Sequence, residues 1–240
     1  MTTLSVQLYS LRDHLTDTLE PTLDRIAEAG ANEVEPFGVE KWAVTLAAPL
    51  QARNLPATSS HGGLLADLEG AVAGAKQLGT KHLFVPSSDR DRWTEAAYVA
   101  DLAGQLNQLA AKLAPEGITV GYHNHEFEFA AKIDGEVAYD VFAAQLDDAV
   151  KLELDTYWAR VGGSDPVDVL AQYGDKITHL HVKDGPLVRG EANVVLGQGQ
   201  MDLDSLLSAS QDKIWVVEFD SCDGDVVQAT VDSLRYLQER

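Results

Sequence analysis

The sequence predicts an α/β protein, a single (β/α)8 TIM barrel that spans residues 1–240. Eight short runs of strand-forming residues alternate with amphipathic helical stretches along the whole chain. The runs begin about 24 to 37 residues apart, which suits one parallel strand and the helix that follows it. An open doubly wound sheet favours a glycine-rich phosphate loop after its first strand, but the corresponding turn, Ser10–His14, contains no glycine. A closed barrel therefore fits the pattern better.

Each predicted strand is rich in valine, isoleucine, leucine or aromatic residues and is bounded by turn-forming residues. The eight runs are Leu4–Tyr9, Asn32–Phe37, Pro56–His61, His82–Pro86, Ile118–Asn124, Val150–Asp155, Ile177–Val182 and Ile214–Phe219.

Several of the helical stretches between these runs have recognisable ends. Asp17–Ala29 and Leu64–Leu78 are followed by Gly30 and Gly79, and glycine readily takes the left-handed conformation that ends a helix. The remaining predicted helices are Thr94–Leu113, Asp165–Tyr173 and Asp225–Gln238.

Composition and charge narrow the class of protein. Hydrophobic residues make up 45% of the 240 residues, enough for a full core, and no linker divides the chain, so one domain is expected. The net charge is −20 and lysine and arginine do not cluster, which disfavours nucleic-acid and membrane partners. Cys222 is the single cysteine, which excludes an internal disulfide and suits a reducing compartment. Met1–Leu4 lacks the features of a secretion signal, and no apolar run approaches about 18 residues, so a cytoplasmic protein is expected.

Polar side chains gather at the ends of the predicted strands. The active site of such a barrel lies where the strands end and the βα loops begin. Here the strands start as apolar runs and end in histidine, aspartate and glutamate, and five of the seven histidines fall at strand ends. The strand-end residues include Gln7, Tyr9, Arg12, Glu35, His61, His123, Asn124, His125, Glu126, Glu128, Asp155, Trp158, His179, His181, Lys183, Asp184, Glu218 and Asp220.

Each of these residues alone has an ordinary structural explanation. An aspartate after a strand commonly caps the next helix, and a single histidine is commonly structural. Together, however, they converge on one rim from at least five strands. Carboxylates brought so close would repel one another, and a divalent cation is the simplest way to hold them. One bound divalent metal ion is therefore expected.

Five strand-end segments carry a resemblance to a known superfamily. They are Val6–Arg12, Gly121–Phe129, Leu154–Thr156, His179–Asp184 and Val217–Glu218. The chain resembles the xylose isomerase-like barrel superfamily, which contains sugar phosphate isomerases and epimerases. The resemblance covers nearly the whole chain and is closest to the branch near inosose dehydratase and 3-keto-sugar enzymes.

The resemblance implies one metal ion at the ends of strands five to eight, with the ligands Glu128, Asp155, His181 and Glu218. Three carboxylates and one imidazole favour Mn²⁺, with Mg²⁺, Co²⁺, Zn²⁺ or Fe²⁺ as alternatives. Many relatives have the first glutamate inside the fifth strand, just before an asparagine, where this chain has His123. The fifth-strand ligand therefore stays open between Glu128, Glu126 and His123, and Glu128 is preferred.

The chemistry implied is proton transfer next to a carbonyl group. A metal chelated by two sugar oxygens acidifies the adjacent C–H bond, and a base then forms an enediolate. The expected function is isomerisation or epimerisation of a sugar or keto-sugar. A lyase acting on a keto-inositol or a 3-keto-glycoside would use the same site. The residues expected to be catalytic are Glu128, Glu218, His125 and Lys183.

The expected substrate is a small sugar or polyol. Gly62-Gly63 is too short for a clear phosphate cradle and few cationic residues lie at strand ends, which favours an unphosphorylated substrate. Relatives often form dimers or tetramers, so a homo-oligomer is compatible with the resemblance. The side chains expected to contact the substrate are Gln7, Tyr9, Arg12, Glu35, His61, His123 and Trp158.

Two other functional classes share this fold. A non-catalytic sugar-binding protein would keep the barrel, but the complete ligand set argues against it. An apurinic endonuclease would need a DNA-binding face, and the charge of −20 argues against that. A metal-dependent sugar enzyme is the function that the sequence favours.

Overall fold

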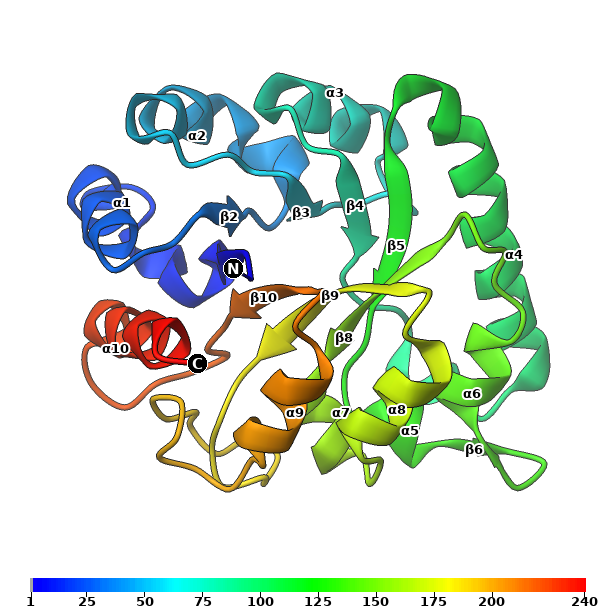
Figure 1. The fold of residues 1–240 in the computed structure, drawn as a ribbon. Coiled ribbons are helices and arrows are strands. Elements are labelled where there is room, and N and C mark those ends of the chain that lie inside the picture. The colour runs from blue at the N-terminus through cyan, green and yellow to red at the C-terminus, as the bar shows by residue number, and fades with distance from the viewer. Residues whose placement is uncertain (1) are drawn as a thin grey trace.

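The structure, a computed structural model that describes residues 2–240, forms the predicted barrel (Figure 1). Eight parallel strands follow one another in the order β2-β1-β10-β9-β8-β5-β4-β3. Backbone hydrogen bonds from Val34 N to Pro56 O (3.0 Å) and from His61 N to Pro36 O (2.8 Å) link β2 to β3 and nearly close the ring. The barrel strands are β1 (Leu4–Gln7), β2 (Glu33–Glu35), β3 (Ser59–His61), β4 (His82–Val85), β5 (Thr119–His123), β8 (Lys151–Asp155), β9 (Ile177–Val182) and β10 (Ile214–Val217).

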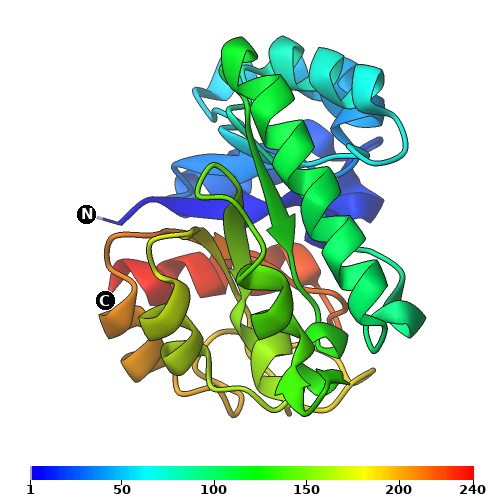
Figure 2. The ribbon, with the colours of Figure 1, turned by 90° about the vertical axis from the view of Figure 1, so that its right-hand side faces the viewer.

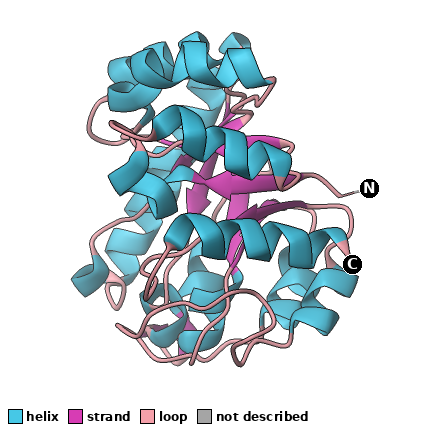
Figure 3. Cartoon of the chain, turned by 90° about the vertical axis from the view of Figure 1, so that its left-hand side faces the viewer, coloured by secondary structure: helices cyan, strands magenta, loops and turns pink. Residues whose placement is uncertain are grey.

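Helices cover the outside of this ring (Figures 1 and 3). The two chain ends lie on the same side of the molecule in Figures 1, 2 and 3, and α4 packs along β5 in Figure 2. The α-helices are α1 (Leu19–Glu28), α2 (Val39–Arg53), α3 (Leu68–Leu78), α4 (Ala96–Leu113), α5 (Phe127–Ala130), α6 (Ala138–Ala143), α7 (Thr156–Val161), α8 (Pro166–Tyr173), α9 (Leu203–Ala209) and α10 (Val226–Gln238). Short 3-10 helices η1 (Leu8–His14), η2 (Arg90–Arg92) and η3 (Ala114–Glu116) and a small hairpin of β6 (Lys132–Ile133) and β7 (Glu136–Val137) complete the fold.

Helix α2 has no counterpart among the predicted helices. Pro49 lies inside it, and proline removes an intrahelical hydrogen bond, so the sequence is a poor helix candidate there. Packing against α3 accounts for the helix. Gly74 of α3 lies so close to α2 that a Cβ atom at that position would come within 2.5 Å of Val39 O.

Alternation along the strands separates an apolar layer from a polar interior. In β9, Leu180 and Val182 are fully buried toward the helices, whereas His179 and His181 face the centre of the barrel. In β8, Leu152 and Leu154 alternate with Glu153 and Asp155 in the same way. The apolar core therefore lies between the strands and the helices, and the interior carries the chemistry. Within residues 2–240, no helix combines the length and the apolar character that crossing a membrane requires.

Candidate metal centre

Four side chains from four neighbouring strands meet at the rim of the barrel. His123 ends β5, Asp155 ends β8, His181 is the last but one residue of β9, and Glu218 directly follows β10. One ligand atom from each lies within 4.8 Å of the other three, and all four residues are buried. Three of them, Asp155, His181 and Glu218, are the ligands predicted for strands six to eight.

Glu128, the preferred fifth-strand ligand, lies apart from this group. The chain leaves β5 at His123 and turns into α5, so strand alternation no longer applies at Glu128. Its carboxylate accepts hydrogen bonds from Tyr122 Oη (2.9 Å) and from the His125 backbone N–H (2.8 Å). Tyr122 faces the helices, opposite to its neighbour His123. His123, one of the three candidates, is the fifth-strand residue that lies with Asp155, His181 and Glu218.

Glu126, the third candidate, also lies outside the group. Arg90 and Arg189 both pair with its carboxylate, the latter at 3.0 Å from Arg189 Nε to Glu126 Oε1. The two arginines follow β4 and β9, so this carboxylate ties two rim loops together.

Lys183 contributes a buried positive charge beside the four side chains. Its Nζ lies 2.8 Å from Asp155 Oδ2, 2.6 Å from Glu218 Oε2 and 2.9 Å from Asp220 Oδ2. Burial alone would lower the pKa of Lys183, but Asp155, Asp220 and Glu218 raise it well above the ordinary lysine value. The side chain is therefore an ammonium ion.

A second layer of charged side chains lies beneath the rim. Glu153 Oε2 is 2.6 Å from His61 Nε2, 3.0 Å from His123 Nδ1 and 3.3 Å from His181 Nε2. Glu35 Oε1 lies 2.8 Å from His181 Nε2. Sequence reasoning missed Glu153, although it stands two residues before Asp155 and alternation puts both on one face.

Burial and neighbouring positive charges have opposite effects on the pKa values of the rim carboxylates. Burial raises the pKa of Asp155 to about 6, although Lys183 and His181 lower it. Burial also opposes ionisation of Glu218, but Lys183 and His181 outweigh it and hold its pKa well below the ordinary value.

Two carboxylates and two imidazoles form a mixed nitrogen and oxygen donor set that suits a divalent transition metal. Each imidazole also faces a carboxylate with its other nitrogen, as metal-binding histidines usually do. The residues therefore fit a divalent cation.

A cavity of about 320 Å³ opens over this centre. Tyr9 and Phe37 line it with aromatic rings in edge-to-face contact, their centroids 5.3 Å apart. His125, Glu218 and Asp220 line it with polar groups. We call this cavity the mouth of the site.

His125 is a neutral imidazole in the mouth. Burial and the charge of Lys183 lower its pKa to about 4. Its Nδ1 is buried and has no hydrogen-bond partner in the described part of the chain, and its ring stacks on Phe127 with the centroids 5.7 Å apart. A neutral imidazole that lines a cavity can accept a proton through its unprotonated ring nitrogen.

The structure divides the residues predicted to contact substrate. Tyr9, His61 and His123 line the mouth. Gln7 and Glu35 are fully buried beneath it, joined by a hydrogen bond of 2.9 Å from Gln7 Nε2 to Glu35 Oε1.

Arg12 and Trp158 lie outside the lining of the mouth. The Arg12 guanidinium lies over the Tyr9 ring and donates hydrogen bonds to the backbone carbonyls of Tyr9 and Asp220. The Trp158 backbone N–H donates a hydrogen bond of 2.8 Å to Asp155 Oδ1, and Lys183 Nζ lies 5.7 Å from the centre of the Trp158 ring. Both residues support neighbouring groups that line the mouth or the centre.

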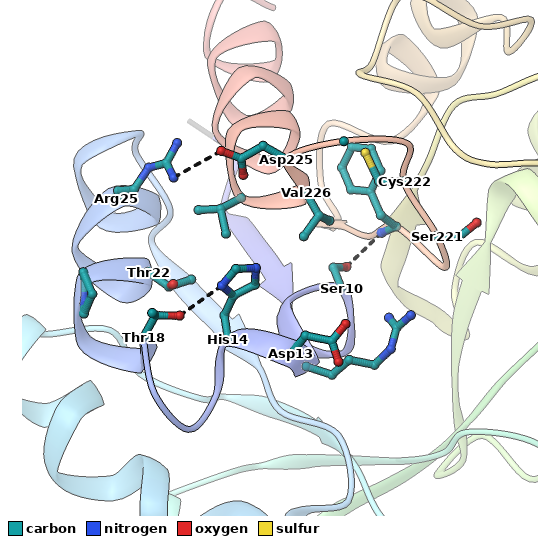
Figure 4. Close-up of a pocket in the computed structure, with 15 residues that line it drawn as sticks. Ser10, Asp13, His14, Thr18, Thr22, Arg25, Ser221, Cys222, Asp225 and Val226 are labelled. Atoms are coloured by element: carbon teal, nitrogen blue, oxygen red, sulfur yellow. Dashed lines mark hydrogen bonds and ion pairs between the residues drawn. The ribbon is translucent and has the colours of Figure 1, made fainter.

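A larger cavity, of about 630 Å³, lies between η1, α1 and the start of α10 (Figure 4). Figure 4 shows His14 hydrogen-bonded to Thr18, and Arg25 facing Asp225 across this space. None of the four clustered rim residues lines it. The chemistry therefore points to the smaller mouth.

Comparison with known proteins identifies the family. The model of a family described as xylose isomerase-like TIM barrel matches residues 5–240. The chain belongs to this family. No curated protein matches it.

Solved structures share the xylose isomerase-like barrel at low sequence identity. A sugar phosphate isomerase/epimerase from Parabacteroides distasonis has a TM-score of 0.84 and 22% identity, over 99% of this chain and 93% of that one. The 3-keto-D-glucoside 4-epimerase of E. coli has a TM-score of 0.71 and 18% identity, over 100% of both chains. The IolI protein, solved with a zinc atom, has a TM-score of 0.72 and 17% identity, over 99% of this chain and 95% of that one. At these identities the likeness shows the fold alone.

Proposed function

We propose that this chain is a divalent-metal-dependent isomerase or epimerase that moves a proton next to the carbonyl of an unphosphorylated sugar or keto-sugar. The observation that carries the proposal is the buried group of His123, Asp155, His181 and Glu218 directly beneath a mouth that also contains the neutral His125. The names of the solved relatives, an isomerase/epimerase and an epimerase, agree with it.

The proposed metal ligands are His123, Asp155, His181 and Glu218. A bound divalent cation, with Mn²⁺ favoured, would polarise the substrate carbonyl and make the neighbouring C–H bond more acidic. Lys183 holds Asp155 and Glu218 in place through its ammonium group. The same ammonium is positioned to stabilise negative charge that develops on a substrate oxygen.

His125 and Glu218 are the proposed acid and base groups. His125 lines the mouth as a neutral imidazole that can accept a proton, and Glu218 is ionised because Lys183 and His181 lower its pKa. They follow different strands, β5 and β10, with two strands between them in the sheet. Two groups on different sides of a carbon atom can remove a proton from one face and return one to the other.

The aromatic rings of Tyr9 and Phe37 favour a substrate with an apolar face, such as a sugar ring. The acidic groups of the mouth, Glu218 and Asp220, disfavour a phosphate beside them. Arg90 and Arg189 are engaged with Glu126. These contacts favour an uncharged substrate.

The test is hydrogen exchange in D₂O with Mn²⁺-loaded protein and a panel of unphosphorylated ketoses, 3-keto-glycosides and keto-inositols, followed by NMR. We expect deuterium at the carbon next to the carbonyl of at least one compound, and product analysis separates epimerisation from isomerisation and elimination.

Asp155→Asn should weaken Mn²⁺ binding by more than about 100-fold. Loss of a residue that only hydrogen-bonds to a metal ligand already lowers metal affinity by about 10–100-fold.

Asp165→Asn is the matched control. Both aspartates cap a helix, Asp155 at α7 and Asp165 at α8, but Asp165 lies outside the centre. The control should keep both metal binding and exchange. Metal-loaded protein that exchanges no proton of any panel compound contradicts the proposal.

A further inference from the structure

One carboxylate oxygen beneath the rim faces three imidazole nitrogens at once. Glu153 Oε2 lies 2.6 Å from His61 Nε2, 3.0 Å from His123 Nδ1 and 3.3 Å from His181 Nε2. Glu35 Oε1 adds a contact of 2.8 Å to His181 Nε2. Both glutamates are fully buried, so water cannot replace these partners.

Two of these imidazoles, those of His123 and His181, face both the buried glutamates below and the carboxylates of the rim above. His181 turns Nδ1 toward Glu218 Oε2 at 2.6 Å, and His123 turns Nε2 toward Asp155 Oδ2 at 3.8 Å. An imidazole that binds a cation is neutral, with one N–H and one lone pair on opposite nitrogens. A proton fixed on the lower nitrogen therefore leaves the lone pair on the upper nitrogen.

We propose that Glu153, assisted by Glu35, is a positioning residue that sets the tautomers of His123 and His181. Glu153 accepts the Nδ1–H of His123, and the two glutamates accept the Nε2–H of His181. The lone pairs of His123 Nε2 and His181 Nδ1 then point into the rim group, where a cation would bind. This inference rests on the proposed metal-dependent function.

The same four residues, His61, His123, Glu153 and His181, have the spacing of a second metal site. The shared imidazoles argue against a second cation. With cations in both layers, His123 and His181 would each have to lose both ring protons. A single cation above an accepting carboxylate needs no such loss, and it reproduces the carboxylate–histidine–metal arrangement common in metalloproteins. The inference therefore includes one metal ion per chain.

The test compares Glu153→Gln with Glu33→Gln by Mn²⁺ titration, with free Mn²⁺ followed by electron paramagnetic resonance. Glu33 is a matched control because it is also a buried glutamate of the barrel, but its hydrogen-bond partner is Thr58. We expect one Mn²⁺ per wild-type chain, a Kd raised about 10–100-fold in Glu153→Gln, and an unchanged Kd in Glu33→Gln.

A second measurement keeps the inference testable if Glu153→Gln does not fold. Nitrogen-15 NMR of histidine-labelled wild-type protein loaded with Mg²⁺ or Zn²⁺ should show the proton on His123 Nδ1 and on His181 Nε2. The opposite tautomer at either ring overturns the inference, as does an unchanged Kd in Glu153→Gln. Two Mn²⁺ per wild-type chain and one in Glu153→Gln would instead establish a second cation site. A wild-type chain that binds no metal overturns the proposed function, and this inference with it.

Discussion

Imidazole rings and carboxylates fill the upper interior of this barrel, where branched apolar side chains commonly pack in other barrels. Glu35, Glu153 and His181 are completely buried, and each lies within hydrogen-bond distance of an oppositely charged or polar partner. Removal of one member of a buried ion pair leaves the other charge without a partner. This loss costs more free energy than the intact pair contributes to stability. Substitutions in this group should therefore be coupled, and single changes should affect several neighbours.

The position of Glu128 leads to a first prediction, which separates stability from metal binding. Burial raises its pKa from 4.5 to about 8, so between these values the carboxyl is protonated in the folded chain and ionised in the unfolded chain. Its contribution to stability is thus complete below about 4.5 and is lost as the pH rises through about 8. Glu128→Gln imitates the protonated form, so its melting temperature should rise relative to wild type as the pH increases over this range.

The same variant should bind Mn²⁺ as tightly as the wild type, because Glu128 contacts Tyr122 and His125 N and not the rim group. Thermal unfolding at several pH values and one Mn²⁺ titration check both parts. Loss of Mn²⁺ binding in Glu128→Gln would return this residue to the ligand set.

His125 leads to a prediction about the pH dependence of catalysis. A general base works in its unprotonated form, and the lowered pKa of about 4 keeps His125 unprotonated at all higher pH values. At saturating metal, kcat/KM for exchange should rise with pH through about 4 and then remain level toward neutrality.

His125→Gln should lower kcat by about 10²–10⁴-fold. His14→Gln, at a histidine outside the mouth, serves as control, and an unchanged kcat in His125→Gln would exclude His125 as the base.

The sequence predicted three of the four clustered rim residues because Asp155, His181 and Glu218 end regular strands, where position along the strand determines direction. At the fifth strand it left Glu128, Glu126 and His123 open, because the chain turns immediately after His123 and the directions of Glu126 and Glu128 depend on that turn. Alternation along β8 was enough to predict that Glu153 shares the inward face of the strand with Asp155. The separation of Arg12 and Trp158 from the mouth depends on loop geometry, which no periodicity encodes.

Among the elements, the long connection from β9 to α9 is organised by one side chain. Asp184 accepts four backbone N–H groups of this loop, from Gly185, Gly197, Gly199 and Met201, at 2.8 to 3.1 Å. Gly199 is required there because a Cβ atom would lie 2.1 Å from Asp184 Oδ1. The loop therefore has a fixed shape although it contains no helix or barrel strand.

Asp184→Asn should loosen this loop, because an amide nitrogen cannot accept the N–H groups that one carboxylate oxygen accepts. Each buried N–H left without a partner costs about 1–3 kcal/mol, so we expect a lower free energy of unfolding and faster tryptic cleavage at Arg189. Asp202→Asn, at the cap of α9, should change little because asparagine also caps helices. Equal cleavage rates in both variants and in the wild type would exclude this role of Asp184.

The regular elements were more predictable than the irregular ones. Each of the eight predicted runs contains one barrel strand, because β-branched residues and turn signals recur with each unit. Helix α2 escaped prediction because tertiary packing against α3 outweighs the unfavourable Pro49. The short elements α5, β6, β7 and α6 between β5 and β8 carry too few residues for a clear period.

At the scale of the whole molecule, the barrel brings residues distant in sequence to one small volume. Glu35 and His181 are 146 positions apart and His61 and Glu153 are 92 apart, yet both pairs are in contact. The apolar layer between strands and helices supplies the stability, which leaves the interior free to hold charged groups. We propose that this interior holds a single divalent cation beneath the mouth of about 320 Å³.

A metal titration of the exchange reaction tests most directly whether one divalent cation per chain is needed for activity. Metal-stripped protein is mixed with the best compound of the ketose panel in D₂O, and the rate of deuterium incorporation is measured as Mn²⁺ is added. We expect no exchange without metal, a rate that rises with added Mn²⁺, and a plateau at one equivalent per chain. Exchange that persists in the metal-stripped protein, or a plateau at two equivalents, would contradict this expectation.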